Sequence, residues 1–332
     1  MTTTATPKRK RWPIVTGLVV LSLVLLPMAF YTPDIPAATL RAKYTTPAST
    51  FMAVEPGLQV HVRDEGPRDA PVLMLIHGSN ASLQTWEPWV KRLSDSFRII
   101  SLDLPGHGLT GASPTRDYSS AGYVRVVNEV AAAKGLTRFA IGGNSMGGGV
   151  AWRYAAAHPE QITGLILVDA AGAPSKTKSD PPLAFKLARM PYVRDVAIKF
   201  LPRSLIEKSL HQTLSVDEVI TPEMIDRYWE LQRHPGNRDA TVDRFAAGFK
   251  PATPADLKGI TMPVLILWGA DDKLIPVDAA AWFSQAVPDA RVTIYQGVGH
   301  APMEEAPDRT AVDVRAFLNG LQTPPAPDSP AR

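Results

Sequence analysis

The sequence predicts an α/β protein built on a doubly wound, mostly parallel β-sheet with helices on both faces. Short apolar runs, each ended by glycine, aspartate or another turn former, alternate along the chain with segments of helical pattern. These runs are nearly continuous in apolar residues, which indicates strands buried on both faces, as in a parallel sheet covered by helices. The predicted strands of this kind lie at 72–78, 97–106, 139–143, 162–170, 263–269 and 291–297.

Further elements are predicted around these strands. FMAV and LQVHVRD, from Phe51 onward, resemble a short β-hairpin that turns at Pro56 and Gly57. Helices are predicted for TWEPWVKRLS, for residues 121–134 and for GGVAWRYAAAHP. The last of these must end at Pro159, because proline cannot continue a helix.

The alternation of strands and helices stops between the predicted strands 162–170 and 263–269. Residues 174–254 are rich in proline and in helical periodicity and contain no good strand. They are predicted to form a helical cap over the C-terminal edge of the sheet, with a second independent domain as the alternative. Residues 51–173 and 255–320 then form the α/β core, because the strand pattern resumes after the insertion. The Pro-rich tail 321–332 has too few apolar residues to pack and is expected to be disordered.

The segment before the hairpin divides into a basic tail, an apolar run and a linker. Residues 14–31 carry no charge and, at 1.5 Å per residue, are long enough to span a hydrocarbon layer of roughly 30 Å as a transmembrane helix. The basic tail 1–13 favours a cytoplasmic N-terminus, which places everything after the linker 32–50 on the extracytoplasmic side of the membrane. The alternative is a cleaved signal peptide, which would leave a secreted or periplasmic protein.

Charge and composition limit the possible partners. The formal net charge of +3 comes from the basic cluster at residues 8–11, and the rest of the chain is close to neutral. The folded part therefore gives no support for nucleic-acid binding. The sequence contains no cysteine, which excludes disulfides, thiolate metal sites and a thiol nucleophile. No feature of the sequence indicates an oligomeric state.

Ser145 is the candidate nucleophile. It lies in GNSMG, a match to GxSxG, between a predicted strand and a predicted helix. In such a nucleophile elbow the serine takes a strained backbone conformation, and glycine at positions 143 and 147 avoids collisions. The alternatives are a glycine-rich turn with an incidental serine, and a phosphate cradle. The latter is disfavoured because no lysine follows as in GxxxxGK[ST].

A serine nucleophile needs a base and an acid, and both follow in the order that elbow enzymes use. Asp272 comes after the predicted strand 263–269, in GADDKLIP, and His300 after the predicted strand 291–297, in GVGH. We expect His300 to take the proton of Ser145 and Asp272 to orient the imidazole. Asp169 and Asp271 are the alternative acids. The remaining histidines are interpreted as structural: His61, His77, His107, His158, His211 and His234.

An oxyanion hole needs two amide donors beside the nucleophile. One is expected from Met146, which follows Ser145 in the sequence. The other is expected from Ser79, directly after the glycine that ends VLMLIHG, with Asn80 as the alternative.

Taken in order, HGSNASLQTW, DLPGHGLTG, GGNSMGGG, WGADDKLIP and GVGHAP resemble the α/β-hydrolase superfamily over most of the chain. The resemblance implies the α/β-hydrolase fold with a helical cap, and neither a metal nor an organic cofactor. It matches the nucleophile, the acid, the base and the two oxyanion donors to Ser145, Asp272, His300, Ser79 and Met146.

The predicted function is hydrolysis of a largely apolar carboxylic ester through an acyl-enzyme on Ser145, as in esterases and lipases. Family members that attack with aspartate are disfavoured, because a serine occupies that position. GNSMGG also resembles hydrolases that cleave C–C bonds in vinylogous diketones, yet these usually carry tryptophan after the histidine, where this chain has Ala301. The sequence also leaves open an acyltransferase and a non-catalytic ligand-binding protein on the same fold.

The cap is expected to select the substrate. Arg189 and Arg194 either meet a substrate carboxylate or face solvent. Five apolar or aromatic side chains either line a pocket or pack the cap's own small core: Phe185, Met190, Tyr192, Trp229 and Phe249.

Overall fold

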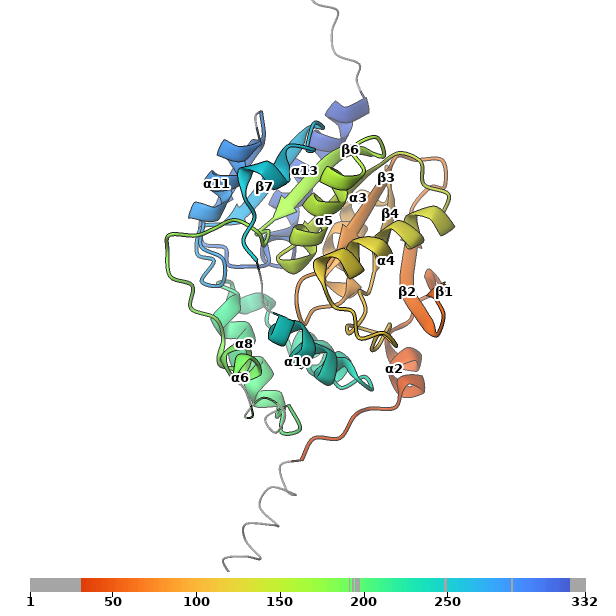
Figure 1. Ribbon diagram of the computed structural model, residues 1–332, viewed down its shortest axis with the longest axis vertical. Coiled ribbons are helices and arrows are strands. Elements are labelled where there is room, and N and C mark those ends of the chain that lie inside the picture. The colour runs from red at the N-terminus through yellow and green to blue at the C-terminus, as the bar shows by residue number, and fades with distance from the viewer. Residues whose placement is uncertain are drawn as a thin grey trace, which may run out of the picture.

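A mixed sheet forms the centre of the molecule. The computed structural model describes residues 31–322 apart from 191, 193, 195–197, 248–249 and 288. These residues form an eight-stranded sheet in the order β1-β2-β4-β3-β5-β6-β7-β8 (Figure 1). β2 pairs antiparallel with β1 and with β4, and all other neighbours are parallel, which confirms the predicted α/β class. The strands are β1 (Ser49–Glu55), β2 (Leu58–Glu65), β3 (Val72–Ile76), β4 (Arg98–Leu102), β5 (Phe139–Asn144), β6 (Ile162–Val168), β7 (Val264–Gly269) and β8 (Arg291–Tyr295).

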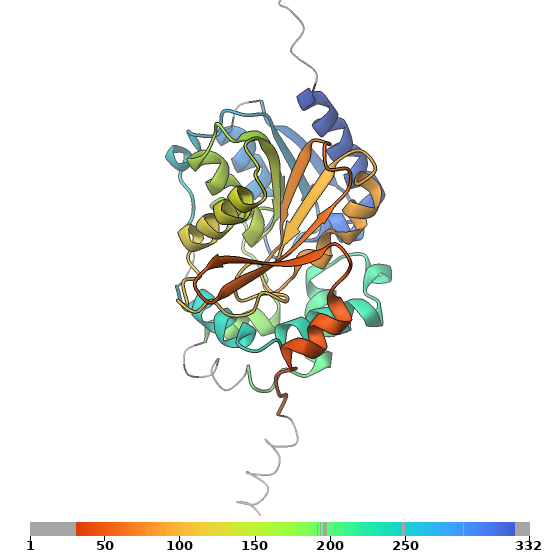
Figure 2. The same ribbon diagram turned by 90° about the vertical axis from the view of Figure 1, so that its right-hand side faces the viewer.

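Helices cover both faces of this sheet (Figure 2). Val127, Val150 and Phe283, one from each of α4, α5 and α11, belong to one buried apolar cluster, whereas Trp89 of α3 and Phe317 of α13 belong to a second. Burial on both faces explains why the parallel strands are continuously apolar in sequence. The helices of the core are α3 (Glu87–Leu93), α4 (Ser120–Ala133), α5 (Met146–Ala157), α11 (Asp278–Ala286), α12 (Pro302–Glu305) and α13 (Pro307–Gln322).

A helical cap separates β6 from β7 in the chain and lies below the sheet in Figure 1. The described residues of the segment 174–254 contain helices and no strand. Ile206 and Ile225 of the cap share a buried cluster with Trp86 of the core, so cap and core pack as one body at this point. The cap helices are α6 (Leu183–Arg189), α8 (Arg203–Thr213), α9 (Pro222–Gln232) and α10 (Asn237–Ala247), with a 3-10 turn at Asp217–Val219.

The segment predicted as a linker contains a helix, α2 (Ala37–Tyr44), that packs against the body. Leu40 is 1% exposed and clusters with Leu231 of the cap. Lys43 forms an ion pair with Glu230 of α9 at 2.8 Å. Local sequence did not predict α2 because its apolar residues form no amphipathic stripe, and its helix is stabilised by these tertiary contacts.

The predicted basic tail and, apart from Tyr31, the predicted anchor lie outside the described residues, as do positions 323–332 of the predicted disordered tail. Within the part of the chain that is described, no helix combines the length and the apolar character needed to cross a membrane.

Candidate active site

Ser145 occupies the sharp turn between β5 and α5, with φ 53° and ψ −120°. Positive φ is costly for a residue with a β-carbon, so neighbouring groups must hold this conformation. The N–H of Ser145 donates to the carbonyl of Val168 at 3.0 Å, and its carbonyl accepts from the N–H of Ala171 at 2.8 Å. The last residue of β6 and the loop that follows it therefore fix the turn.

The glycines of the GxSxG motif are required by packing. A β-carbon at Gly143 would lie 2.3 Å from the carbonyl carbon of Gly147, and one at Gly147 would lie 2.1 Å from the carbonyl oxygen of Ile76. Both contacts are with backbone, which cannot rotate away. The close approach brings the first turn of α5 against the end of β3, so the loop after β3 lies beside Ser145.

His300 and Asp272 form a buried pair in the loops after β8 and β7. Nδ1 of His300 lies 2.7 Å from Oδ2 of Asp272. Oδ1 of Asp272 accepts from the N–H groups of Leu274 at 2.7 Å and Ile275 at 2.9 Å, which fixes the plane of the carboxylate. Because the carboxylate accepts, Nδ1 of His300 carries a proton, and in the neutral imidazole this leaves Nε2 as the acceptor nitrogen that a general base requires.

The two alternative acids are placed differently. Asp271 is exposed. Asp169 is buried with φ 44°, and its Oδ1 accepts from the N–H of Gly269 at 3.0 Å, while Oδ2 has no hydrogen-bond partner among the described residues. Burial, reinforced by the charge of Asp272, raises the pKa of Asp169 well above its ordinary value. Burial therefore disfavours the charged form of Asp169, and the acid hydrogen-bonded to His300 is Asp272.

Glu305 of α12 holds the loop that carries His300. Its Oε2 accepts from the N–H of Gly299 at 2.9 Å and its Oε1 from the N–H of Ala301 at 3.0 Å. These two amides flank His300 in the chain. A carboxylate that accepts several backbone N–H groups fixes the path of the loop, because charge-assisted hydrogen bonds are short and strong.

The same loop is bonded to the cap. Oε2 of Glu305 also accepts from the N–H of Ser215 at 2.7 Å, and the N–H of His300 donates to the carbonyl of Thr213 at 3.1 Å. Sequence reasoning did not single out Glu305. The only local signal was its place five residues after His300 at the start of the C-terminal helices.

The two predicted oxyanion residues lie next to Ser145. Met146 is the first residue of α5, so its N–H has no acceptor within the helix. A β-carbon on Gly78 would lie 3.2 Å from Cβ of Ser145, so the backbone that leads to Ser79 passes directly beside the serine. The backbone on which the predicted oxyanion hole depends therefore passes beside Ser145.

One pocket between the sheet edge and the cap contains Ser145 and His300; we call it the main pocket. Its empty space, including the part open to solvent, is about 700 Å³. On the cap side, α8 contributes Ile206 and Leu210 from one face, and Leu214 follows directly after its end. The lining residues are Gly78, Ser79, Asn80, Ala81, Asn144, Ser145, Pro182, Phe185, Ile206, Ser209, Leu210, Thr213, Leu214, Tyr228, Gln232, Leu274, His300 and Ala301.

Several polar side chains of the main pocket have partners within the protein. The hydroxyl of Ser209 donates to the carbonyl of Leu205 at 2.7 Å, and that of Thr213 donates to the carbonyl of Ser209 at 2.8 Å. The hydroxyl of Tyr228 donates to Glu304 at 2.8 Å. Because these hydroxyl groups are bonded within the protein, the cap wall presents a more apolar surface to a ligand than its residue types suggest.

The cap residues singled out from the sequence have different environments. Phe185 lines the main pocket. Trp229 donates its Nε1 proton to a backbone carbonyl of the cap at 2.7 Å, as a packing residue does. Met190 and Tyr192 are 47% and 90% exposed. Phe249 lies outside the described residues.

His77 behaves as the structural histidine that was predicted. Its Nδ1 lies 2.7 Å from the carbonyl of Gly78, and its Nε2 accepts from the N–H of Leu104 at 3.0 Å. A carbonyl can only accept and an amide N–H can only donate, so the imidazole is neutral with its proton on Nδ1. Burial lowers the pKa of His77, in agreement with this assignment.

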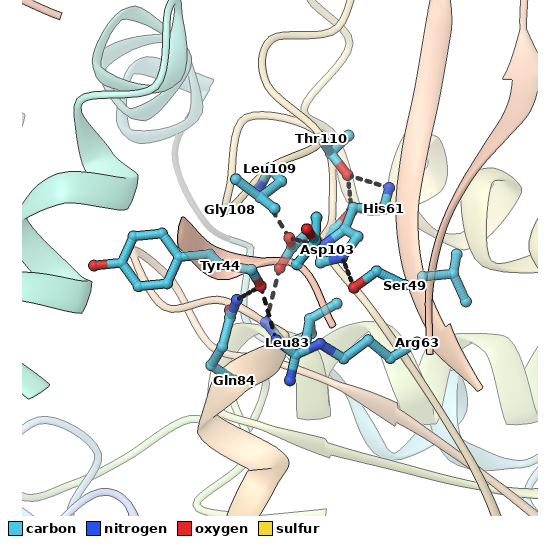
Figure 3. A network of polar contacts seen from close by, with 12 residues as sticks. Tyr44, Ser49, His61, Arg63, Leu83, Gln84, Asp103, Gly108, Leu109 and Thr110 are labelled. Carbon is cyan, nitrogen blue, oxygen red and sulfur yellow. Dashed lines mark hydrogen bonds and ion pairs between the residues drawn. The ribbon is translucent and has the colours of Figure 1, made fainter. Parts of the chain in front are cut away.

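A second Ser-His-Asp set lies at the β1–β2 hairpin (Figure 3). Nδ1 of His61 is 2.7 Å from Asp103, and Nε2 is 2.9 Å from Oγ of Ser49. Asp103 also accepts from the N–H groups of Leu83 at 2.7 Å and Leu109 at 2.8 Å. None of these five residues lines the main pocket. The set ties the hairpin to the loop after β3, and we interpret its role as structural.

Asp169, Asp272 and His300 are also the residue types that bind metals, and one ligand atom from each lies within 4.8 Å of the others. A metal at this point would have to displace the proton shared by His300 and Asp272 at 2.7 Å. The geometry is that of an acid–imidazole pair.

Comparisons with known proteins identify the family of this fold. A family model described as the alpha/beta hydrolase fold matches residues 71–307. An uncharacterized protein of Mycobacterium tuberculosis is 30% identical over 75% of this chain and 75% of its own length. Lipase 3 of a Moraxella species is 27% identical, covering 75% of this chain and 78% of the lipase.

The names of two further matches state an enzyme activity. A 2-hydroxy-6-oxononadienedioate/2-hydroxy-6-oxononatrienedioate hydrolase of a Pseudomonas species is 27% identical over 78% of this chain and 91% of its own. The crystal structure of a membrane phospholipase A, a bacterial virulence factor, is 25% identical and superposes with a TM-score of 0.70, covering 94% of this chain and 98% of that one.

Proposed function

Because this chain belongs to the α/β-hydrolase family, we propose that it is a serine hydrolase that cleaves a largely apolar carboxylic ester. The observation that carries the proposal is the pairing of His300 with Asp272 at 2.7 Å, in the pocket that also contains the elbow serine, Ser145. The geometry supports nucleophilic acyl transfer, because it combines a nucleophile, a neutral acceptor nitrogen and adjacent amide donors.

In the proposed mechanism, Oγ of Ser145 attacks the ester carbonyl while Nε2 of His300 takes its proton. Asp272 stabilises the imidazolium that forms. The N–H groups of Ser79 and Met146 bind the oxyanion of the tetrahedral intermediate. The imidazolium then protonates the leaving alcohol, and water activated by His300 hydrolyses the acyl-enzyme, which restores Ser145.

The lining of the main pocket supports an apolar acyl group. Phe185 of α6 and the α8 face of Ile206, Leu210 and Leu214 surround the space next to Ser145. Burying one methylene of an acyl chain against such a surface is worth about 0.8 kcal/mol. We therefore expect turnover to favour medium-length acyl chains over acetyl.

A fluorophosphonate probe and a panel of chromogenic esters test this function. The probe is expected to label the wild-type protein and to leave Ser145→Ala unlabelled. The ester panel is expected to show kcat/KM rising with acyl length until the main pocket is filled. Full labelling of Ser145→Ala, or a wild type that is neither labelled nor active on any ester, would contradict the proposal.

A C–C bond hydrolase is the second candidate, because a Pseudomonas relative carries that activity in its name. The substrate in that name is a dienedioate, which carries carboxylates. Among the described residues, no lysine or arginine lines the main pocket, and the cap candidates Arg189 and Arg194 do not contribute to its lining. A lining without a cation favours an uncharged ester. Turnover of a dienoate diketone with little activity on simple esters would reverse this choice.

We further propose that residues 14–31 anchor the enzyme in a membrane, with the catalytic part on the extracytoplasmic side. The uncharged apolar run and the basic residues before it support the proposal, and one structural neighbour is a membrane phospholipase A. The full-length protein is expected to stay in the membrane fraction through high-salt washing and to be extracted by detergent. Release by salt would contradict the anchor, and a shortened chain would indicate signal cleavage.

A further inference from the structure

The loop after β3 carries Ser79, and it contains a strained residue, Asn80, with φ 60°. This left-handed conformation is uncommon for a residue with a β-carbon, although asparagine tolerates it better than most. Such a conformation persists where the surrounding structure holds it. The contacts that hold Asn80 therefore also fix the chain next to Ser79.

Asn80 is held by the cap. Its Oδ1 accepts from Nη2 of Arg244 at 2.7 Å and from the hydroxyl of Thr241 at 3.1 Å, both on α10. Arginine has only donors, so the atom that faces it must be the amide oxygen. Thr241 has one proton for two acceptors, because its hydroxyl also lies 3.1 Å from the carbonyl of Asn237. Arg244 is thus the firmer of the two anchors.

Arg244 is itself fixed in place. It is 9% exposed, and its Nη1 lies 2.7 Å from Nε2 of His107. Nδ1 of His107 donates to the carbonyl of Pro105 at 3.1 Å, so Nε2 accepts from the guanidinium. Burial, together with the charge of Arg244, lowers the pKa of His107 well below its ordinary value and keeps the imidazole neutral. Because Arg244 is buried and bonded to His107 as well as to Asn80, it holds the side chain of Asn80 in a fixed position.

We propose that Asn80 is a positioning residue through which the cap helix α10 holds the oxyanion donor Ser79 in its working orientation. The N–H of Ser79 belongs to the peptide unit directly before the one that joins Ser79 to Asn80, so a change in the backbone of Asn80 reaches this N–H through the Cα of Ser79. Catalysis by amide donors depends on placement within a fraction of an ångström. The cap is then part of the catalytic centre as well as a wall of the pocket. This inference rests on the proposed ester hydrolysis at Ser145.

Three variants of the full-length protein test the inference. Asn80→Ala removes the anchor, and we expect kcat on a short water-soluble ester to fall at least about tenfold with KM little changed, because donors of this kind act in the transition state. Asn80→Asp keeps the acceptor oxygen and the tolerance for positive φ, so kcat is expected to recover to within about threefold. Thr241→Val is expected to give a smaller loss than Asn80→Ala.

Asp243→Asn is the matched control. Asp243 lies on the same helix and pairs with Arg116 of the core at 2.7 Å, and the two side chains are 28% and 66% exposed. The substitution weakens a partly exposed contact between cap and core without touching Asn80, and wild-type kcat is expected. Melting temperatures of all variants establish that each is folded.

The affinity for a trifluoromethyl ketone that forms a tetrahedral adduct on Ser145 supplies a second readout. It is expected to fall in Asn80→Ala in proportion to kcat and to be unchanged in Asp243→Asn. If Asn80→Ala lowers the melting temperature but keeps wild-type kcat and ketone affinity, Asn80 only packs the cap and the inference is wrong. If the wild type neither turns over esters nor binds the ketone, the proposed function fails, and this inference fails with it.

Discussion

Asn144 donates its side-chain amide to the carbonyl oxygen of His300 at 3.0 Å, and also to the carbonyl of Val168 at 3.2 Å. The residue before the elbow serine thus holds the loop of the proposed base, across a sequence separation of 156 residues. Asn144 is 4% exposed, so water has little access to these bonds. A direct hydrogen bond thus joins the chain segment of the proposed nucleophile to that of the proposed base.

Asn144→Ala is expected to lower both stability and activity. The two carbonyls lose their donor in a buried place, which costs about 1 to 3 kcal/mol of unfolding free energy. The loop of His300 also loses its tie to β5, so kcat is expected to fall while KM changes little. Chemical denaturation and steady-state kinetics measure the two effects. Asn128→Ala, which removes an acceptor for the hydroxyl of Tyr154 at 3.3 Å outside the main pocket, should leave kcat unchanged.

Ser49→Ala is expected to keep full activity and full fluorophosphonate labelling. Ser49 belongs to the second Ser-His-Asp set, in which its hydroxyl lies 2.9 Å from Nε2 of His61. Removing that hydrogen bond should cost about 1 kcal/mol of stability, measured by denaturation. If Ser145→Ala retains labelling that is lost when Ser49→Ala is added, then the hairpin set is a reactive site and its structural interpretation is wrong.

Asp272→Asn and Asp169→Asn are expected to differ greatly in activity. Asp272 is the hydrogen-bond partner of Nδ1 of His300, and an amide at this position favours the wrong imidazole tautomer. In a Ser-His-Asp triad on an unrelated fold, the corresponding change lowers kcat about 10⁴-fold. Asp169 accepts from the N–H of Gly269 and burial disfavours its charge, so kcat of Asp169→Asn should stay within about tenfold of wild type. Comparable losses in the two variants would mean that Asp169 serves as a second ionised acid.

The stability of Asp169→Asn should depend on pH in a defined direction. Burial raises the pKa of Asp169 in the folded state, so its contribution to stability is fully present below the unfolded pKa of about 3.9 and is lost as pH rises through the folded pKa. The amide that replaces this carboxyl does not titrate. The free energy of unfolding of Asp169→Asn, relative to wild type, should therefore increase from pH 4 towards neutral pH in denaturation experiments at fixed salt.

Asp278 supplies a control, because its pKa is shifted in the opposite direction to that of Asp169. Although burial raises its pKa, hydrogen bonds from Ser175 and from the N–H groups of Lys176 and Thr177 lower it overall. Its contribution is present above the unfolded pKa and is lost as pH falls. Asp278→Asn should therefore be less stable than wild type from neutral pH down to about pH 4, and the difference should shrink only as the pH falls further. Parallel trends for the two variants would contradict the assigned directions.

The sequence predicted the features that depend on residues close together in the chain. The strands, the elbow glycines and the positions of Ser145, Asp272 and His300 follow from local pattern, because each lies directly after an apolar strand. The contacts of Asn144 with His300 and of Asn80 with Arg244 join residues 156 and 164 positions apart. No local propensity encodes such pairs. The helix α2 was missed for a related reason, since its stability comes from the cap and the hairpin against which it packs.

Glu305→Gln is expected to uncouple the loop of His300 from both the core and the cap. The carboxylate accepts backbone N–H groups on each of its oxygens, from Ala301 on Oε1 and from Gly299, Ser215 and Val216 on Oε2. A glutamine must turn its NH₂ group towards donors on one side, which leaves at least one buried N–H facing another donor. The expected cost is about 2 to 3 kcal/mol of unfolding free energy.

Activity should fall in the same variant, because His300 is displaced from its position beside Ser145. We expect kcat to decrease at least about tenfold, with an altered pH profile of kcat/KM, since the environment of the base changes. Glu55→Gln is the control: it removes an ion pair with the half-exposed Arg125 at 2.8 Å, outside the main pocket, and should cost less than about 1 kcal/mol. A Glu305→Gln enzyme with wild-type kinetics would show that the loop of His300 is positioned by the remaining contacts alone.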